Sequence, residues 1–365
     1  MDAHAWFQGL FEEHKRLTDV HLHEGEGVRI RVDGRLTRID AKAESFLFDG
    51  IAQAAGWPAR WREQLQGHYR LTGSGWVGQF RCRLHAYRHK DGVGVALRRF
   101  PAVIPPFGDL GLPSSVLSIV EAMHGLFLVA GATNSGKSTT LAALVEHLAV
   151  RPIHIVTIED PVEYVHAGNE ALITTKQIER DTEGFAQALR DALREDPDVI
   201  MLGEIRDAET MRIALSAAET GHLVMGTLHA NSAVGVVDRV LDFFSLGDHD
   251  VVRALVASTI CGIVAQQLLP NAAGRGLVLA YEIMEMRPSI GALIRSGRVM
   301  ELRAAITNPS DGNRRNLELL NATLVRLLRE GRITEEVARV AAYDQEDLEV
   351  RLSKNGSARQ NTRAA

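Results

Sequence analysis

Alternation of apolar and polar residues characterises the first hundred residues of the chain. Such alternation, bounded by turn-forming dipeptides, is typical of short half-buried strands. The clearest segments of this kind are 28–32, 80–87 and 93–97, with turns predicted at Asp33-Gly34 and near Asp91-Gly92. Helical spacing of apolar residues predicts two helices between these strands, over 45–55 and 59–66. Residues 1–100 are therefore predicted to form a small α+β domain.

Proline and glycine interrupt both patterns over residues 101–113, which we interpret as a linker. Beyond it, helical segments alternate with short, mainly apolar runs. Those runs are 126–130, 153–158, 199–202 and 223–226. Apolar strands that are separated by helices predict a parallel sheet covered on both faces. An α/β core domain is therefore expected over residues 114–288.

The C-terminal part of the chain is predicted to be helical. Short amphipathic patterns with Arg/Glu-rich outer faces over 289–343 predict a helical subdomain, whereas the polar composition of 344–365 predicts a disordered tail. The longest apolar stretch, 251–269, is interrupted by polar residues such as Arg253 and Gln266. We therefore expect a core helix there and no transmembrane segment.

Composition narrows the possible functions. A chain of 365 residues fits two domains and a tail, and its net charge of −5 gives no overall attraction to nucleic acid, so no direct nucleic-acid partner is expected. The N-terminus lacks a basic segment followed by an apolar run, so a cytoplasmic location is expected. Cys82 and Cys261 stand alone, which excludes a paired-cysteine zinc site and favours packing roles.

One segment carries a phosphate-binding pattern. Residues 131–138 read Gly-Ala-Thr-Asn-Ser-Gly-Lys-Ser, directly after an apolar run and before a helical segment. The glycines let backbone N–H groups face phosphates, the lysine meets the β- and γ-phosphates, and the last serine is placed for Mg²⁺. The candidate nucleotide contacts are Gly131, Thr133, Ser135, Gly136, Lys137, Ser138 and Thr139, with Ser138 also a candidate metal ligand. A chance match is the alternative, and the flanking strand and helix argue against it.

Carboxylates follow two of the predicted strands. The strand 198–202 is followed by Gly203 and Glu204. A P-loop fold places an acidic residue near the metal ion at this point, and Gly203 stands in place of the usual aspartate. Glu204 is therefore a candidate catalytic and metal-binding residue. Glu159 and Glu163 follow the strand 153–158 at the edge where open α/β sheets bind ligands. Glu163 first, and Glu159 second, are candidates to orient or deprotonate the attacking water, unless either only orders the loop.

Two histidines flank the strand 223–226. His222 precedes it and His229 follows it. Histidines in such places are usually held by structural contacts, but His229 falls at the same predicted sheet edge as Glu163 and Glu204, which favours contact with the γ-phosphate or its water. His222 and His229 are both included among the candidate catalytic residues.

Taken together, these segments resemble the four nucleotide motifs of secretion ATPases. The matching segments are 131–138, the acidic box 158–163, 198–206 and the histidine box 217–229. The stretch 189–198, Leu-Arg-Asp-Ala-Leu-Arg-Glu-Asp-Pro-Asp, is especially similar to the type IV pilus retraction ATPase (PilT) family. The resemblance runs from about Thr18 to Ala342. It implies a PAS-like N-terminal domain, a RecA-like P-loop ATPase domain, ATP and Mg²⁺ as ligands, and a ring of six subunits.

The resemblance also implies roles for arginines of the N-terminal domain. In that family, arginines on the strands of this domain reach the nucleotide phosphates as the domains close. The matching segments here are 79–83 and 96–99, and we favour Arg81 and Arg98 because guanidinium groups suit charge spread over phosphoryl oxygens. The alternatives are Arg83, Arg88 and Arg99.

A C-terminal segment, 288–297, resembles the retraction family's signature Ala-Ile-Arg-Asn-Leu-Ile-Arg-Glu. Ile290, Leu293, Ile294 and Arg295 match it, whereas Gly291, Ala292 and Ser296 replace Arg, Asn and Glu. Two interpretations remain open. The helix either only packs its apolar residues inward, or also lets Arg295 communicate with a neighbouring subunit or partner.

The resemblance implies a homo-hexameric ATPase that drives type IV pilus retraction. Such a motor acts on an inner-membrane platform protein and lies peripherally at the inner membrane. The sequence lacks the Cys-x-x-Cys pairs and the longer N-terminal region of assembly ATPases, which favours retraction. The rivals are an ATPase of a conjugative or type IVB secretion system, a RecA-like nucleic-acid motor, which needs a basic and aromatic groove, and a nucleotide switch without useful turnover.

Overall fold

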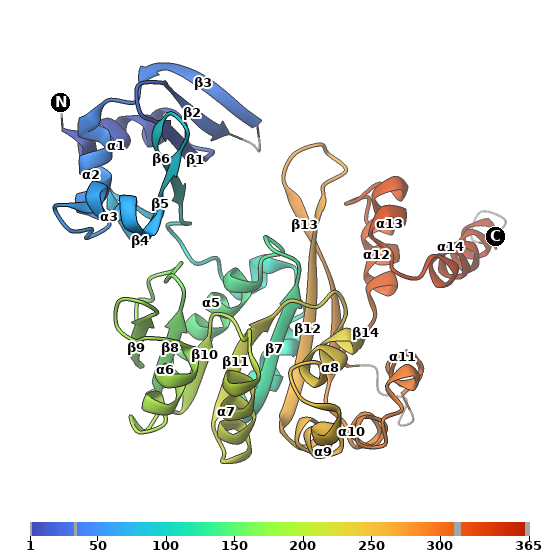
Figure 1. The fold of residues 1–365 in the computed structure, drawn as a ribbon. Coiled ribbons are helices and arrows are strands. Elements are labelled where there is room, and N and C mark those ends of the chain that lie inside the picture. The colour runs from blue at the N-terminus through green and yellow to red at the C-terminus, as the bar shows by residue number, and fades with distance from the viewer. Residues whose placement is uncertain (1, 33–34, 310–314, 362–365) are drawn as a thin grey trace. The chain divides into compact units, whose positions relative to one another are not determined.

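The computed structural model describes residues 2–32, 35–309 and 315–361, with side chains up to residue 353 (Figure 1). The predicted turn at Asp33-Gly34 lies outside these residues. The chain separates into two compact units. The first consists of Met1–Ile104 with Pro161–Val165, and the second of Pro105–Asp160 with His166–Ala365.

In the part that the structure describes, the first unit is a six-stranded antiparallel sheet with three helices. The strands run in the order β3-β2-β1-β6-β5-β4. Their bounds are β1 (Leu17–His23), β2 (Gly27–Val32), β3 (Arg35–Lys42), β4 (Arg70–Val77), β5 (Phe80–His89) and β6 (Gly92–Arg99). The helices are α1 (Ala3–Glu13), α2 (Ser45–Ala54) and α3 (Trp61–His68). The predicted strands and both predicted helices of this region are confirmed, whereas α1 had not been predicted.

Alternation along the strands of the first unit gives its sheet one apolar and one polar face. Leu22 on β1 and Leu84 on β5 are fully buried with Phe7 of α1 and Phe48 of α2. Cys82 belongs to the same cluster, and burial raises the pKa of its thiol to about 12. This cysteine is therefore a packing residue, as the sequence indicated.

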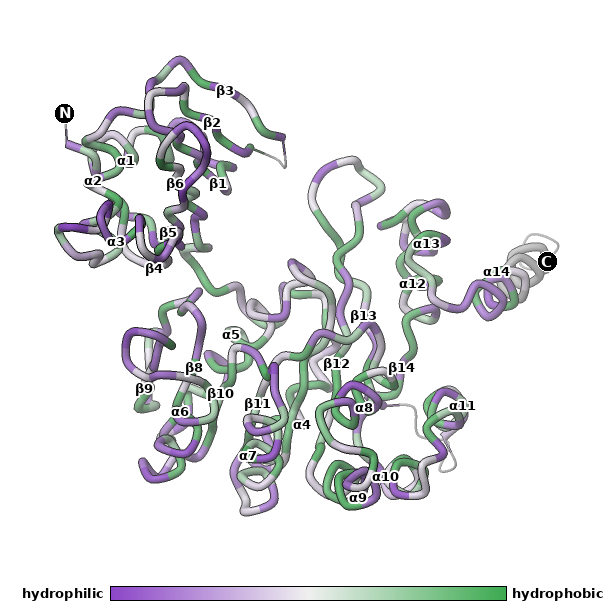
Figure 2. Tube along the Cα trace, in the orientation of Figure 1, coloured by the Kyte–Doolittle hydropathy of each residue, from purple (hydrophilic) through white to green (hydrophobic). Residues whose placement is uncertain are grey.

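The second unit is built on an eight-stranded mixed sheet in the order β14-β13-β12-β7-β11-β10-β8-β9. The strands are β7 (Gly125–Gly131), β8 (His154–Glu159), β9 (Leu172–Gln177), β10 (Val199–Leu202), β11 (Leu223–Leu228), β12 (Ile260–Pro270), β13 (Leu277–Glu285) and β14 (Leu317–Glu318). The four predicted apolar strands are confirmed and run parallel. They are among the most apolar segments of the chain (Figure 2).

Helices cover both faces of this sheet. Alternate strand residues, among them Leu128, Ile158 and Leu202, share one apolar core with five helices of the described chain. These are α6 (Phe185–Ala192), α7 (Ala208–Glu219), α8 (Ala233–Leu241), α9 (His249–Thr259) and α10 (Pro288–Arg295). The strand residues in between, such as Phe127, point to the other face of the sheet and are equally buried. Helix α5 (Lys137–Leu148) covers that face. Helix α4 (Leu117–Val120) and short 3₁₀ turns at Phe107–Leu110, Ser114–Val116 and Leu246–Asp248 belong to the same unit.

The apolar stretch 251–269 is not one core helix. Helix α9 ends at Thr259, and strand β12 begins at Ile260. The β-branched residues Ile260, Ile263 and Val264 favour a strand, and β12 finds a pairing partner in β7. At Gly262 a Cβ would come within 3.0 Å of Ile119, so the glycine lets this strand lie close to α4. Periodicity alone could not separate the two elements, because both are apolar.

The predicted helices of the C-terminal part are confirmed as α10 (Pro288–Arg295), α11 (Leu302–Thr307), α12 (Leu320–Arg329) and α13 (Glu335–Ala341), with a 3₁₀ turn at Val299–Glu301. The predicted disordered tail instead contains helix α14 (Gln345–Asn361). Leu348 is fully buried, and Asn321 of α12 donates to Asp347 at 2.8 Å. These tertiary contacts stabilise a helix whose composition is polar. None of the described helices is both long and apolar enough to cross a bilayer.

Candidate functional site

The phosphate-binding pattern lies at the junction of a buried strand and a helix. Strand β7 ends at Gly131, and α5 begins at Lys137. Between them the backbone turns through positive φ at Asn134 (64°) and at Gly136 (89°), and Gly131 has φ 151°. Lys137 Nζ donates to the carbonyl oxygens of Gly131 at 3.0 Å and Ala132 at 2.8 Å. The ammonium group is therefore folded over the loop.

The loop has the space and the polar groups that a phosphate requires. A Cβ on Gly131 would lie 2.4 Å from Ser135 Oγ, so only glycine fits there. Ser135 Oγ is buried and makes no hydrogen bond within the described residues. Thr133 is exposed, and Ser138 and Thr139 are half-buried on the first turn of α5. An anion at this helix N-terminus would meet backbone N–H groups, hydroxyls and one ammonium.

Four parallel strands end at the same edge of the sheet as this loop. In the order β7-β11-β10-β8, their C-terminal ends carry the loop, His229, Glu204 and Glu159. The sequence-based expectation of one shared edge is therefore confirmed for His229, Glu204 and Glu159. Because parallel strands align their carboxyl ends, the polar groups that follow them come together there.

Glu204 is the centre of a small charged cluster. One carboxylate oxygen lies 3.2 Å from His229 Nε2, and the other accepts a hydrogen bond from Arg206 at 2.7 Å. Arg206 also lies 3.9 Å from Asp160, and the hydrogen bond to Glu204 raises the pKa of its guanidinium. The Glu204 side chain remains about one-fifth exposed, so a ligand can reach it.

Arg206 was not predicted as a site residue, although it closes the 198–206 motif. The one sequence feature that could have pointed to Arg206 is the pattern Glu204-Ile205-Arg206 after a strand. Opposite charges at this spacing also occur on surfaces without a binding function.

Gly203 allows the ends of two strands to approach each other. A Cβ at this position would lie 3.3 Å from Glu159 Cα, and the Gly203 amide donates to Ile158 O at 2.8 Å. Thr227 Oγ1 donates to the Gly203 carbonyl at 2.6 Å. The glycine in place of the usual aspartate therefore fits the close packing of β10 against β8.

The two glutamates of the acidic box occupy different surroundings. Glu159 is buried at the end of β8 and accepts a hydrogen bond from Thr157 Oγ1 at 3.1 Å. Glu163 lies four residues further on, in the segment Pro161–Val165 that groups with the first unit. The two carboxylates therefore belong to different units of the chain.

His222 is not brought to this edge. It precedes β11, whereas His229 follows it, so the two histidines lie at opposite ends of a strand of six residues, roughly 20 Å long. His222 Nδ1 instead contacts Ala217 O at 3.1 Å and Thr220 Oγ1 at 3.2 Å. In the described chain His222 packs at the end of α7. Strand β11 separates it from His229.

The candidate arginines lie on neighbouring strands of the first unit. Arg98 on β6 donates from Nε to the largely buried Asp19 at 2.8 Å and remains about half exposed. Arg81 on β5 is half-buried opposite Trp76. Arg99 stacks on Phe80 with 4.0 Å between its Cζ and the ring centroid, which favours a packing role over a mobile one.

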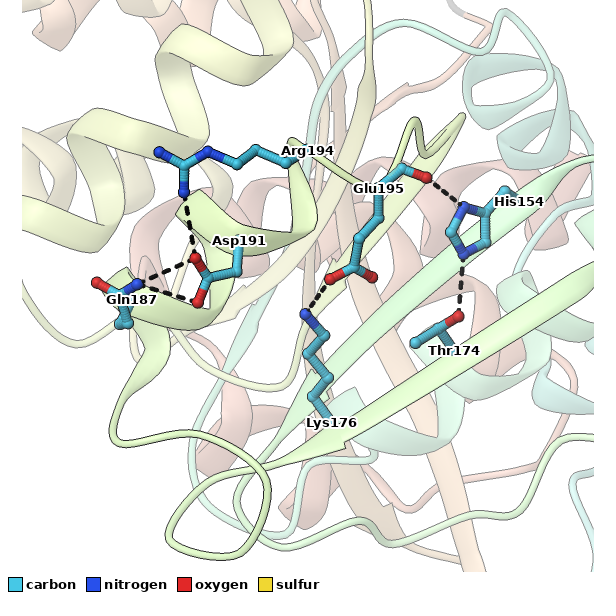
Figure 3. A network of polar contacts seen from close by, with 7 residues as sticks. All are labelled: His154, Thr174, Lys176, Gln187, Asp191, Arg194 and Glu195. Atoms are coloured by element: carbon cyan, nitrogen blue, oxygen red, sulfur yellow. Dashed lines mark hydrogen bonds and ion pairs between the residues drawn. The ribbon is translucent and has the colours of Figure 1, made fainter.

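The stretch 189–198, which carries the family resemblance, forms a polar network beside β8 and β9 (Figure 3). His154 Nδ1 contacts the Glu195 carbonyl at 3.0 Å, and its Nε2 contacts Thr174 Oγ1 at 3.0 Å. The Glu195 carboxylate pairs with Lys176. Asp198 accepts a hydrogen bond from the His154 amide at 2.8 Å. The network therefore joins the start of β8 to the end of α6 and positions the strand that leads into the acidic box.

Comparison with known proteins places this arrangement in a family. A model of the type II/IV secretion system protein family matches residues 112–345. The type IV pilus retraction ATPase PilT of Pseudomonas aeruginosa is 37% identical over 340 residues, which cover 91% of this chain and 96% of that protein. The chain belongs to the type II/IV secretion system protein family. Within it, the chain is a member of the pilus retraction ATPase group, and it is an ATPase.

Solved structures agree with this assignment. The crystal structure of the pilus retraction motor PilT with bound ADP superposes with a TM-score of 0.86 at 36% identity, over 96% of this chain and 99% of that one. The ATPase DotB of Legionella pneumophila superposes with a TM-score of 0.77 at 26% identity, over 93% of this chain and 95% of that one. The two-unit α/β architecture is thus shared across nearly the whole length of both proteins.

Proposed function

We propose that this protein is a homo-hexameric motor that hydrolyses ATP to retract a type IV pilus. The observation that carries the proposal is its similarity to the retraction ATPase PilT, at 37% identity over 96% of that protein. The likeness to DotB motivates the rival, an ATPase of a conjugative or type IVB secretion system, but identity there is only 26%. The main proposal is therefore retraction.

For the architecture, we propose a PAS-like N-terminal domain over 1–100, a linker over 101–113 and a RecA-like ATPase core over 114–288, followed by the helical subdomain 289–343. The antiparallel sheet of the first unit and the parallel strands that end at the same edge as the phosphate loop support these assignments. The subunit is expected to act at the inner membrane through a platform protein of the pilus machine and to lie in the cytoplasm.

For the chemistry, Lys137 and the N–H groups of the loop would bind the β- and γ-phosphates of ATP. Mg²⁺, held by Ser138 and Glu204, would neutralise charge on the phosphates when bound. The hydroxyl and carboxylate oxygens of these two residues are ligands that Mg²⁺ prefers. Oxygens of the ATP phosphates would complete the ligand set of the ion.

Hydrolysis needs a water that is oriented toward the terminal phosphate. We assign this role to Glu163, with Glu159 as the alternative, because a carboxylate can accept a proton from that water. His229, fixed by Glu204 at 3.2 Å, would contact the γ-phosphate or the water. Arg81 or Arg98 would add positive charge to the phosphoryl oxygens as the domains close.

The test is genetic and separates the two systems. Deletion of the gene in its own organism should abolish twitching while pili accumulate on the surface, and a plasmid copy of the parental gene should restore twitching. A copy carrying Lys137→Ala should not. Loss of conjugative transfer or protein secretion with unchanged pili would instead support the rival.

A further inference from the structure

A glutamine from the neighbouring strand touches both ends of the phosphate loop. Gln266, on β12, lies in register with Gly131 at the end of β7. Its carbonyl oxygen lies 2.5 Å from the point that a Cβ on Gly131 would occupy. Its side-chain Nε2 donates to Thr140 Oγ1 at 2.7 Å. One residue therefore contacts the start of the loop with its backbone and the first turn of α5 with its amide.

Both partners of this hydrogen bond are removed from water. Gln266 is 4% exposed and Thr140 is 2% exposed. The Thr140 amide donates to Gly136 O at 3.0 Å, so Thr140 lies in the helical turn that closes the loop. A buried hydrogen bond that loses one partner leaves the other unpaired, because water cannot replace it. The bond therefore fixes where α5 begins relative to β7.

We propose that Gln266 is a positioning residue of the ATP site. Its hydrogen bond to Thr140 holds the first turn of α5 at a fixed distance from Gly131, and so orients the loop N–H groups and Lys137 toward the phosphates. The inference rests on the assignment of residues 131–138 as the ATP-binding loop. A shift of a fraction of an ångström in this turn would misalign donors that act together on one anion.

The same strand supplies a matched control. Gln267 follows Gln266 directly, so its side chain points to the opposite face of the sheet. Gln267 is half-buried. Its buried Oε1 makes no hydrogen bond within the described residues. Gln267→Met therefore removes the same kind of group from the same strand without touching α5.

The experiment measures the affinity of the full-length protein for ADP with Mg²⁺ by calorimetry, well below the unfolding temperature of each variant. Gln266→Met and Thr140→Val should each weaken ADP binding by about tenfold, the effect of one lost buried hydrogen bond. The double variant should also lose about tenfold, because the two changes remove one shared bond. Gln267→Met should bind within about twofold of the parent, and Thr140→Ser, which keeps the hydroxyl, should bind like the parent.

Two results would overturn the proposal. One is parental ADP affinity in Gln266→Met with a lowered unfolding temperature, which would make the bond purely structural. The other is a double variant whose loss is the product of the single losses. If Gln266→Met does not fold, the comparison of Thr140→Val with Thr140→Ser decides alone. Unchanged ADP affinity in Lys137→Ala would refute the loop assignment itself, which is a different failure.

Discussion

The imidazole Nε2 of His229 lies 3.2 Å from a carboxylate oxygen of Glu204, across the adjacent ends of β11 and β10. The other oxygen of the same carboxylate accepts a hydrogen bond from Arg206 at 2.7 Å. One carboxylate thus organises two groups, each of which carries or can take up a proton. Its charge determines how both are oriented at the edge where the phosphate loop begins.

Replacing Glu204 by Gln should separate binding from hydrolysis. The amide keeps the shape of the side chain but removes the charge that we assign to the metal, so turnover should fall by about 10²–10³-fold while ATP affinity stays within a few-fold. Steady-state phosphate release and binding of a fluorescent ATP analogue measure the two quantities. Glu209→Gln, at an exposed position on α7, is the matched control and should hydrolyse ATP normally. Lost binding in Glu204→Gln would contradict the assignment.

Replacing Lys137 by Ala should weaken nucleotide binding and abolish turnover. The ammonium is the only side-chain cation of the loop 131–138, and a charge-assisted contact to phosphate is among the strongest that a protein makes. We expect turnover to fall by at least about 100-fold. Lys90→Ala, which changes an exposed lysine of the β5–β6 turn, should leave turnover unaltered. Normal hydrolysis by Lys137→Ala would refute the site.

Replacing Arg98 by Ala should lower turnover roughly tenfold and nucleotide affinity much less, if the guanidinium meets the phosphates only late in closure. Arg98 also pairs with Asp19 at 2.8 Å, so a second variant must separate the two roles. Asp19→Asn breaks the ion pair but keeps the guanidinium, and it should hydrolyse ATP faster than Arg98→Ala. Equal losses would mean that the pair with Asp19 explains the effect. Arg81→Ala should behave like Arg98→Ala.

Replacing Arg295 by Ala should leave hydrolysis near the parental rate but prevent retraction in cells. Ile290 and Ile294 are buried and seat α10, whereas Arg295 is exposed at its C-terminal end. The apolar contacts therefore survive the change. Arg298→Ala, at an exposed arginine that pairs with Glu301 at 2.6 Å, is the control and should support twitching. An equal loss of hydrolysis and movement in Arg295→Ala would show that this helix does not separate chemistry from work.

His166 should make folding stability depend on pH. Its side chain is 2% exposed and hydrogen-bonds Glu146 at 2.9 Å. Burial lowers the pKa of His166, against the opposing effect of Glu146. Because the folded-state pKa lies below the unfolded value of about 6.5, the unfolded chain takes up the proton first as pH falls. The stability that neutral His166 contributes is therefore fully present above about pH 6.5 and declines below it.

The variant His166→Asn tests this, since Asn keeps an N–H donor toward Glu146 but does not titrate. The difference in unfolding free energy between parent and variant, from urea titrations, should narrow between pH 7.5 and pH 5.5. A constant difference would mean that His166 has the same pKa in both states.

Local patterns were sufficient where the chemistry is local. The phosphate loop was found because glycines, a lysine and a serine must follow a strand at fixed spacing. The strands 126–130, 153–158, 199–202 and 223–226 were found because strands buried on both faces are mainly apolar. The shared edge of Glu204 and His229 followed from parallel strands alone. The same logic places His222, which precedes the strand 223–226, at the opposite edge, so its inclusion among the candidate catalytic residues was wrong in position.

The sequence by itself determined the two-part α/β organisation, the family and the positions of the loop and of Glu204, because each depends on spacing within a few residues. Only the tertiary structure decided that 251–269 divides into α9 and β12, and that residues 345–361 form α14 against α12. It alone joined Gln266 to Thr140, which are 126 positions apart. The physical reason is that such contacts depend on strand order and register, and a two-residue period fixes which face a side chain takes but not which strand lies beside it.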